Sequence, residues 1–310
     1  MTSSVLDIGQ KRSRPRSFWQ RRLVAKHGPV VAIVLGLIVV WYIAAIVMNA
    51  ALVRDAFERE ETQYSLVDLI DGTLNAERPL VAAPHQIVAE FANEVFGYPP
   101  SSPRSLVYHG YVTLSATIVG FGIGAVVGIL LAVLIVHIRT LERSLLPWII
   151  CSQMVPILAV APIIIVVLGA VGLRGLLPKS IISAYLCFFP ITIGMVKGLT
   201  SPDPMQSDLM HTWSATPSQI FWKLRCPASV PFLFASLKVA VTISLVGAIV
   251  GELPTGAQAG IGARLLAGSY YGQTLQIWAA LFAAALLAAA LIGIVGFAER
   301  LTLKSMGARP

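Results

Sequence analysis

The chain has 310 residues, of which 56% are hydrophobic and only 12% are charged, and its mean hydropathy is +0.77. Soluble domains average about 45–50% apolar and about 25% charged residues. These values exclude a disordered chain, a nucleic-acid-binding domain and an ordinary soluble enzyme, and they indicate a chain whose solvent is mainly lipid. The formal net charge of +8 could indicate a polyanionic partner, so its meaning depends on where the charged residues lie along the chain.

The charged residues divide by segment. Residues 1–29 hold seven basic side chains and one acidic side chain, whereas residues 54–108 hold four basic and nine acidic ones. Short cytoplasmic flanks of membrane proteins are rich in Lys and Arg. We therefore expect 1–29 to be a basic cytoplasmic segment and 54–108 to be an external segment.

Apolar runs between the charges predict six transmembrane helices, because a spanning helix needs about 20 apolar residues. The first run, 30–53, is too long for the apolar core of a signal peptide, which has about 7–15 residues. We predict an all-α polytopic membrane protein with both termini cytoplasmic, a core five-helix domain over 109–300 and a cytoplasmic tail over 301–310. The six runs cover residues 30–53, 110–136, 145–173, 180–196, 230–251 and 275–298.

Two helices carry recognisable faces. Small residues recur every fourth position in the second run, which predicts close packing of helix backbones in lipid, although membrane composition alone also produces such spacing. In the external segment, residues 85–96 follow a helical period of apolar side chains and precede Gly97, a plausible C-cap. We expect this amphipathic helix to lie along the outer interface or to dock on the transmembrane body. The small residues are Ala116, Gly120, Gly124, Gly128 and Ala132.

Motifs for covalent chemistry are absent from the sequence. It contains no G-x-x-x-x-G-K-[ST], no H-E-x-x-H and no G-x-S-x-G. The cysteines Cys151, Cys187 and Cys226 fall in predicted spans or a cytoplasmic loop, so we predict neither a disulfide nor a metal site. We expect no catalytic residue and no bound cofactor in this chain.

The long loop between the fourth and fifth spans, residues 197–231, has a pattern that indicates a function. Thr216 can cap a helix that begins at Pro217. We expect Pro227 and Pro231 to end that helix and restart the chain as the fifth span. The result is a short helix, a turn and a helix parallel to the membrane, with Phe221 and Leu224 presenting apolar surface beside Lys223 and Arg225 for a groove on a cytoplasmic partner.

A second feature is polar and aromatic content at membrane depth. Such side chains are costly in lipid, so they face either a cavity or a partner helix. One interpretation is the lining of a translocation path, and the other is hydrogen bonding between helices. Lys238, charged within the fifth run, is expected to extend to the inner interface. The candidate path residues are Gln153, Met154, Tyr185, Phe189, Thr242, Ser244 and Glu252.

Over residues 84–300, the order of short sequence motifs resembles that of the permease subunits of binding-protein-dependent ABC importers, in the nitrate/sulfonate/taurine-type branch. The loop resembles their E-A-A-x-x-x-G motif, with Asp208 at the Glu position, Ser214 at the Gly position and Pro227 at the later Pro. The family's glycine allows a sharp turn between coupling helices, and Ser214 departs from it. Further matches are Thr113-Leu114, Gly120-Phe121, Gly124, Gly128, Arg139, Glu142, Pro156, Ala159, Pro162, Phe188-Phe189-Pro190, Leu237-Lys238, Gly251-Glu252 and Gly260-Ile-Gly262.

The resemblance implies a type I permease fold and an inner-membrane importer driven by ATP. It implies a second permease copy, as a homodimer, two ABC ATPase subunits docked on the loop, and an external solute-binding protein. ATP and Mg²⁺ would be bound by the ATPase subunit. The loop residues implied in coupling are Asp208, Ser214, Pro217, Phe221, Lys223, Pro227 and Pro231.

The solute implied is small, polar and organic, of the sulfonate, taurine or nitrate type. The alternative within the same importer type is a pyrimidine, thiamine-precursor or riboflavin-like heterocycle. A stand-alone secondary transporter is a different class, and it would require an internal repeat or membrane-embedded charges. A membrane-bound enzyme would require a catalytic cluster.

Overall fold

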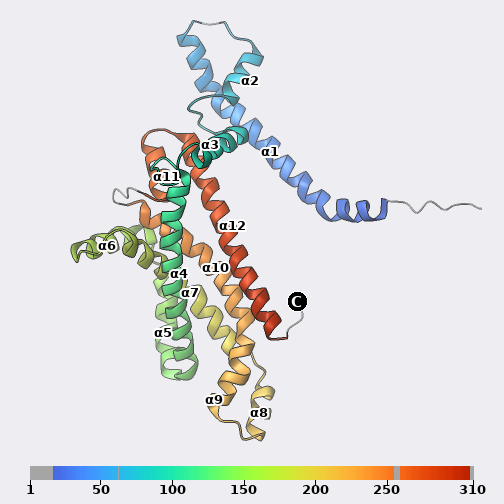
Figure 1. Cartoon of the computed structure of the whole chain (residues 1–310), viewed down its shortest axis with the longest axis vertical. Helices are drawn as coiled ribbons and strands as arrows, with labels where there is room; N and C mark the ends of the chain where they lie inside the picture. The colour runs from blue at the N-terminus through green and yellow to red at the C-terminus, as the bar shows by residue number, and fades with distance from the viewer. Residues whose placement is uncertain (1–16, 62, 255–258, 308–310) are drawn as a thin grey trace, which may run out of the picture. The chain divides into compact units, whose positions relative to one another are not determined.

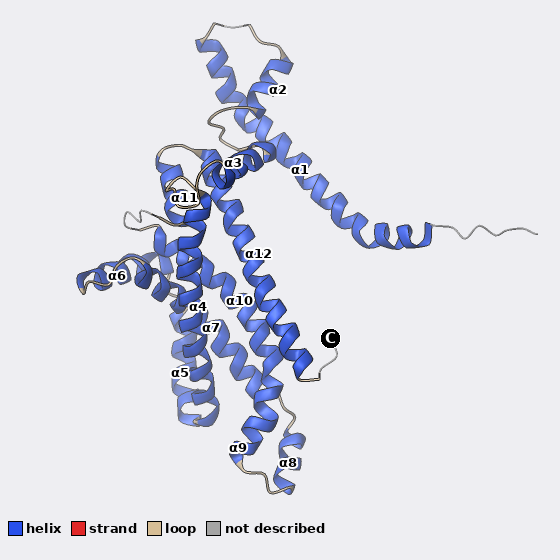
Figure 2. Ribbon diagram, in the orientation of Figure 1, coloured by secondary structure: helices blue, strands red, loops and turns tan. Residues whose placement is uncertain are grey.

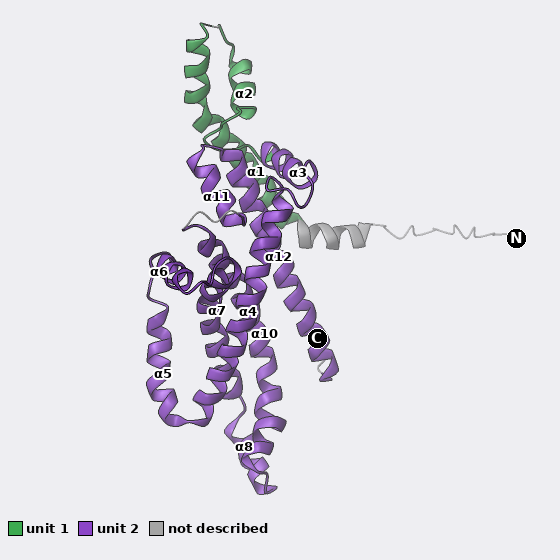
Figure 3. Cartoon of the chain, turned by 60° about the vertical axis from the view of Figure 1, so that its left-hand side comes forward, with its two compact units in different colours: residues 1–84 green, residues 85–310 purple. Residues whose placement is uncertain are grey.

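The computed structural model describes residues 17–61, 63–254 and 259–307, so residues 1–16 of the predicted basic segment 1–29 lie outside the described residues. Every regular element of the described part is a helix (Figure 2), which confirms the all-α fold class. Five of these helices are long and apolar enough to cross a membrane, or six if one bent pair forms a single span. The chain divides into two compact units, residues 1–84 and 85–310 (Figure 3).

The first unit consists of α1 (Ser17–Arg59) and α2 (Leu66–Leu74). α1 contains the predicted first span and continues beyond it to Arg59. α2, which our sequence analysis does not predict, begins with a capping box: the Ser65 hydroxyl accepts a hydrogen bond from the Asp68 N–H, and the Asp68 carboxylate accepts one from the Ser65 N–H.

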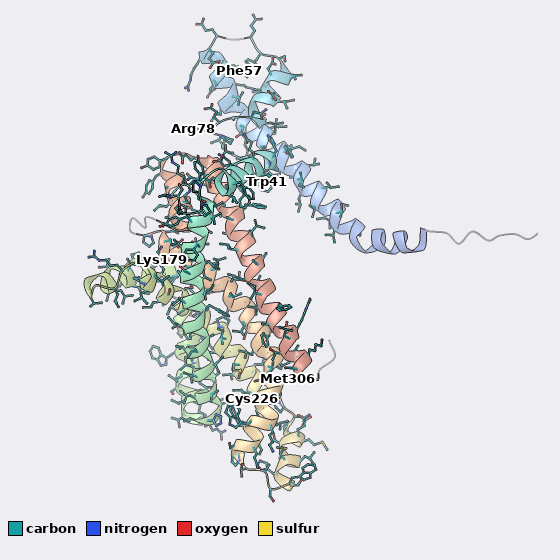
Figure 4. All side chains as sticks on the ribbon, viewed as in Figure 1. Trp41, Phe57, Arg78, Lys179, Cys226 and Met306 are labelled. Atoms are coloured by element: carbon teal, nitrogen blue, oxygen red, sulfur yellow. The ribbon has the colours of Figure 1, made fainter. Side chains whose placement is uncertain are left out.

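Asn49 fixes the chain after α2 against α1. Its side chain is fully buried although it lies within the first apolar run. Nδ2 donates to the carbonyl oxygens of Thr73 at 3.2 Å and Val81 at 2.9 Å, and Oδ1 accepts from the Leu80 N–H at 2.8 Å. Trp41, seen with its side chain in Figure 4, donates through Nε1 to the Ala82 carbonyl oxygen at 3.1 Å. An amide buried in an apolar helix is stable here because its donor and acceptor are both used.

The second unit holds the remaining helices, coloured from green to red in Figure 1. Its centre is the packing of α4 against α7 and of α7 against α10. The helices are α3 (Pro84–Phe96), α4 (Leu106–His137), α5 (Arg139–Ser152), α6 (Ile157–Ala170), α7 (Leu176–Leu199), α8 (Pro204–Thr212), α9 (Pro217–Ile220), the π-helical turn η1 (Phe221–Arg225), α10 (Cys226–Glu252), α11 (Ile261–Tyr270) and α12 (Thr274–Ser305).

The small-residue face of α4 packs directly on α7. A Cβ atom at Gly120 would collide with the side chain of Ser183, and one at Gly124 would collide with the sulfur of Cys187. By contrast, a Cβ atom at Gly122, on another face of α4, would have no neighbour within 4 Å. The spacing therefore reflects a specific helix contact in this chain rather than general membrane composition.

The third predicted span is not a single straight helix. α5 and α6 meet at a bend of 97°, at the break Gln153–Pro156. Pro156 is the N-cap of α6 and has extended backbone angles, and its missing N–H and ring prevent α5 from continuing through it. Pro147 and Pro162, in contrast, lie inside α5 and α6.

α3 packs against α4, α11 and α12, which are the contacts expected for docking on the transmembrane body. Phe91 and Val95 pack against a buried apolar cluster, and Glu94 pairs with Arg264 of α11. Burial raises the pKa of the Glu94 carboxyl above its ordinary value, and the guanidinium of Arg264 opposes that rise. The cluster is formed by Leu106, Ile261, Ala280 and Ala283.

Candidate functional site

The coupling loop (residues 197–231) folds as a helical hairpin, with α8, a turn, and a second helix. Thr216 caps the second helix: its hydroxyl accepts from the Gln219 N–H at 3.3 Å, and the Gln219 side-chain oxygen accepts from the Thr216 N–H at 2.9 Å. The helix begins at Pro217, as predicted.

The predicted stop and restart at Pro227 and Pro231 is wrong. The helix that begins at Pro217 runs on to Glu252 without a sharp bend, passing through the π-helical turn η1. Pro227 lies just after the π turn η1, and this wider turn accommodates the missing N–H and the proline ring within the continuous helix.

Ser214 makes the sharp turn in the hairpin with a backbone φ of +55°. This left-handed conformation is the one that glycine adopts at low cost and that a side chain disfavours. The backbone geometry thus gives a physical reason for glycine at this position of the family motif. In this chain the turn is retained with a strained serine.

We expect Ser214→Gly to stabilise the coupling loop by about 1 kcal/mol, since it removes the Cβ from a left-handed position. Ser218→Gly is the matched control, because Ser218 lies within helix α9 and glycine there should destabilise the loop. Thermal unfolding of the purified full chain measures both. A lower melting temperature for Ser214→Gly would contradict the assignment of strain.

The exposed apolar surface of the coupling loop differs from the predicted one. Phe221 is half-buried and packs against the bundle beside Met195 and Leu199, with its ring edge-on to that of His137. Trp213 and Trp222 are instead 78% and 66% exposed. Neither residue is among the predicted surface residues; the signal that could have identified them is the presence of two tryptophans in a loop that the charge distribution places in water. Exposed with them are Met205, Leu209, Asp208, Ser214, Pro217, Lys223 and Pro231, whereas Pro227 is half-buried.

Three of the candidate path residues meet at the bend between α5 and α6. Gln153 is the C-cap of α5, and its Nε2 is buried with no hydrogen-bond partner among the described residues. Met154 is 75% exposed. The hydroxyl of Tyr185, from α7, donates to the Ser152 carbonyl oxygen at 2.5 Å, which satisfies one carbonyl freed by the helix break.

The other four candidates lie elsewhere. Ser244 is fully buried between three helices: its hydroxyl donates to the Thr117 carbonyl oxygen of α4 at 3.1 Å and lies 2.7 Å from the Ser183 hydroxyl of α7. Phe189 and Thr242 are half-buried. Glu252 is fully buried at the end of α10. For Ser244 and Glu252 the geometry supports the second interpretation, hydrogen bonding between helices.

Glu252 is the centre of a polar cluster that joins four helices. Its carboxylate accepts from the Thr113 hydroxyl of α4 at 2.9 Å, from the Gly262 N–H of α11 at 2.9 Å and from Lys179 Nζ of α7 at 3.4 Å. Gly260, with φ of +125°, passes so close that a Cβ atom there would overlap the carboxylate. The cluster fixes the start of α11 to the N-terminal parts of α4 and α7 and to the C-terminal end of α10.

Near the middle of α10, Lys238 pairs with Glu299 of α12. The sequence predicts only that Lys238 extends to the inner interface, and this ion-pair partner is not among its expected contacts. A lysine and a glutamate in separate apolar segments, 61 residues apart, give no local signal that they meet.

Comparison with known proteins identifies the family. Residues 124–303 match the family model described as "Binding-protein-dependent transport system inner membrane component". The formylaminopyrimidine transport permease protein ThiX of Halalkalibacterium halodurans is 33% identical over 192 residues, which are 61% of this chain and 72% of the relative. The riboflavin transport system permease protein RibX of Chloroflexus aurantiacus is 32% identical over 196 residues, 63% of this chain and 71% of the relative.

A more distant relative is named for a different solute. The nitrate import permease protein NrtB of Synechocystis sp. is 25% identical over 187 residues, 60% of this chain and 63% of the relative. The matched region runs from the small-residue face of α4 to the end of α12 and includes the coupling loop. The chain therefore belongs to the family of binding-protein-dependent transport system inner membrane components, the permeases of ABC importers.

Proposed function

We propose that this chain forms the translocation pathway of an ATP-driven importer in the cell inner membrane, with both termini cytoplasmic and residues 54–108 external. Two copies of the chain assemble with two ABC ATPase subunits and receive solute from an external binding protein. The ATPase subunits bind ATP and Mg²⁺, and this chain performs no covalent chemistry. Membership of the permease family supports this assembly.

The observation that carries the proposal is the apolar surface of the coupling loop. Trp213 and Trp222 are largely exposed on a hairpin that also presents Lys223. Exposed aromatic groups beside charges are typical of protein interfaces, where tryptophans contribute much of the binding energy. The hairpin therefore inserts into a groove of the ATPase subunit, and ATP-driven movement of that subunit is passed to α10 through the continuous helix that begins at Pro217.

Replacing both tryptophans by alanine is expected to weaken ATPase binding at least tenfold, because truncating one interface tryptophan commonly costs about 2 kcal/mol. Co-purification of the ATPase subunit and binding-protein-stimulated ATP hydrolysis measure the effect. A charge reversal, Lys223→Glu, should reduce stimulated hydrolysis to a smaller extent.

Trp148→Ala is the matched control, since Trp148 is also 75% exposed but lies in α5. It should leave the ATPase bound. Unchanged ATPase binding and stimulation in the double variant would overturn the coupling assignment. Ion-gradient-driven uptake by the purified chain alone would favour the secondary transporter.

The solute path passes the bend between α5 and α6, where Gln153 offers an unpaired amide and Met154 is exposed. The solute is small, polar and organic. Two classes of solute are compared: a heterocycle and a sulfonate, taurine or nitrate-like solute. The relatives named for a pyrimidine and for riboflavin share 33% and 32% identity with this chain, whereas the nitrate permease shares 25%. This difference favours a heterocycle over a sulfonate, taurine or nitrate-like solute. Uptake of labelled pyrimidine, riboflavin, taurine and nitrate by the reconstituted importer distinguishes them.

A further inference from the structure

A pocket of about 970 Å³ lies where α4 and α7 begin and α10 ends. Its volume is in the range of small-molecule sites. One wall is a single face of α4: Tyr108, Tyr111, Val112 and Ser115 follow the helical spacing that places side chains side by side. The rest of the lining comes mainly from α6, from Arg174 and the first turn of α7, and from the end of α10.

The charge of this pocket is positive and unbalanced. Lys179 lines it, but its ammonium group is already engaged by the Glu252 carboxylate at 3.4 Å and by the Ala259 carbonyl oxygen at 3.0 Å; the labelled Lys179 can be found in Figure 4. Arg174 is exposed and has no hydrogen-bond or ion-pair partner among the described residues. No described Asp or Glu lines the pocket. The guanidinium of Arg174 is therefore available to an acceptor from outside.

Two further features suit a planar anion. Tyr108 and Tyr111 line the pocket with aromatic rings, on which a flat solute can stack. α7 starts at Leu176 after Gly175 with no side-chain cap, so the N–H groups of Leu176 and Leu177 add to the positive potential beside Arg174. A guanidinium with aromatic walls favours a ring that carries an anionic group over a compact anion.

We propose that this pocket is an entry site that binds a small planar heterocycle bearing an anionic group, with Arg174 holding the anion and Tyr108 and Tyr111 holding the ring. The proposal rests on the proposed function, because it places the pocket at the external mouth of the path. The proposed site restricts the solute class to planar molecules that carry an anionic group.

The first test asks whether Arg174 attracts anions into the pocket. The variant Ser115→Cys is made in the full chain after its native cysteines have been replaced. It is reconstituted in vesicles together with the ATPase and the binding protein. The rate of modification is compared for a methanethiosulfonate reagent with a sulfonate group and one with a trimethylammonium group. Relative to each reagent's rate with a free thiol in solution, the sulfonate reagent should react several-fold faster. Arg174→Gln should abolish this preference, and Arg174→Lys should largely retain it. Arg104→Gln, a second exposed external arginine that does not line the pocket, should leave it unchanged.

The ring specificity is tested by protection. Orotate, a planar pyrimidine carboxylate, should slow modification of the cysteine more than taurine at equal concentration, and Tyr108→Ala should remove that difference while the charge preference persists. Equal protection by both solutes, no preference between reagents, or protection by anionic phosphatidylglycerol in place of orotate would overturn the proposal. Modification needs no ATP, so failure of ATPase coupling would contradict the proposed function and leave this result intact.

Discussion

Glu252→Ala is expected to destabilise the folded chain by about 3–5 kcal/mol, the usual cost of removing one partner from a buried ion pair. The side chain of Glu252 is fully buried and that of Lys179 is 12% exposed. Without the carboxylate, Lys179 keeps a poorly solvated charge, and the buried Gly262 N–H loses its acceptor. Unfolding of the purified chain in mixed detergent micelles measures the loss. The end of α10 and the start of α11 should then become accessible to protease first.

Two variants separate charge from packing at this cluster. Glu252→Gln retains an acceptor for the Thr113 hydroxyl and the Gly262 N–H, so it should cost less than alanine. The double variant Lys179→Met/Glu252→Leu removes both charges together and should recover much of the lost stability, because apolar replacement of a whole buried pair is often neutral. Equal losses for Glu252→Ala and the double variant would show that the ion pair does not account for the effect.

The sequence predicts the parts of this fold that depend on periodicity and on local capping. Apolar runs locate the spans because lipid requires a long uncharged helix. The small residues of α4 identify its packed face, and Thr216 with Pro217 locates the start of α9, since both signals lie within one turn of the residues that they affect. The left-handed turn at Ser214 is likewise local to the hairpin.

Contacts between distant segments are not available from such patterns. Glu252 meets Thr113 and Lys179 only after three helices have packed, so its polarity alone could not separate a path residue from a buried partner. The prolines of the third run do not reveal which of them bends the chain: Pro147 and Pro162 are accommodated within helices, and Pro156 breaks one. For the same reason, the sequence could not show that Phe221 turns into the bundle while Trp222 remains exposed.

Gly124→Leu is expected to prevent α4 from reaching its packed position on α7. Even a single Cβ at Gly124 would overlap the Cys187 sulfur and would lie 3.1 Å from the carbonyl oxygen of Ala184, so a leucine must displace the α7 backbone itself. Overpacking of a closed core typically costs about 1–3 kcal/mol, and a displaced backbone places this change at or beyond the upper end of that range. We expect poor expression, an early unfolding transition and loss of stimulated ATP hydrolysis.

Gly122→Leu is the matched control, because it adds the same side chain to the same helix at a position with no neighbour within 4 Å. It should be close to neutral. A milder pair tests the contact itself: Gly124→Ala should destabilise the chain, and Cys187→Ala in the same chain should restore most of the loss, since it removes the atom that the new Cβ meets first. Additive effects of these two changes, or equal damage from Gly122→Leu, would mean that the small residues of α4 are not the surface that holds α7, and that the centre of the bundle packs elsewhere.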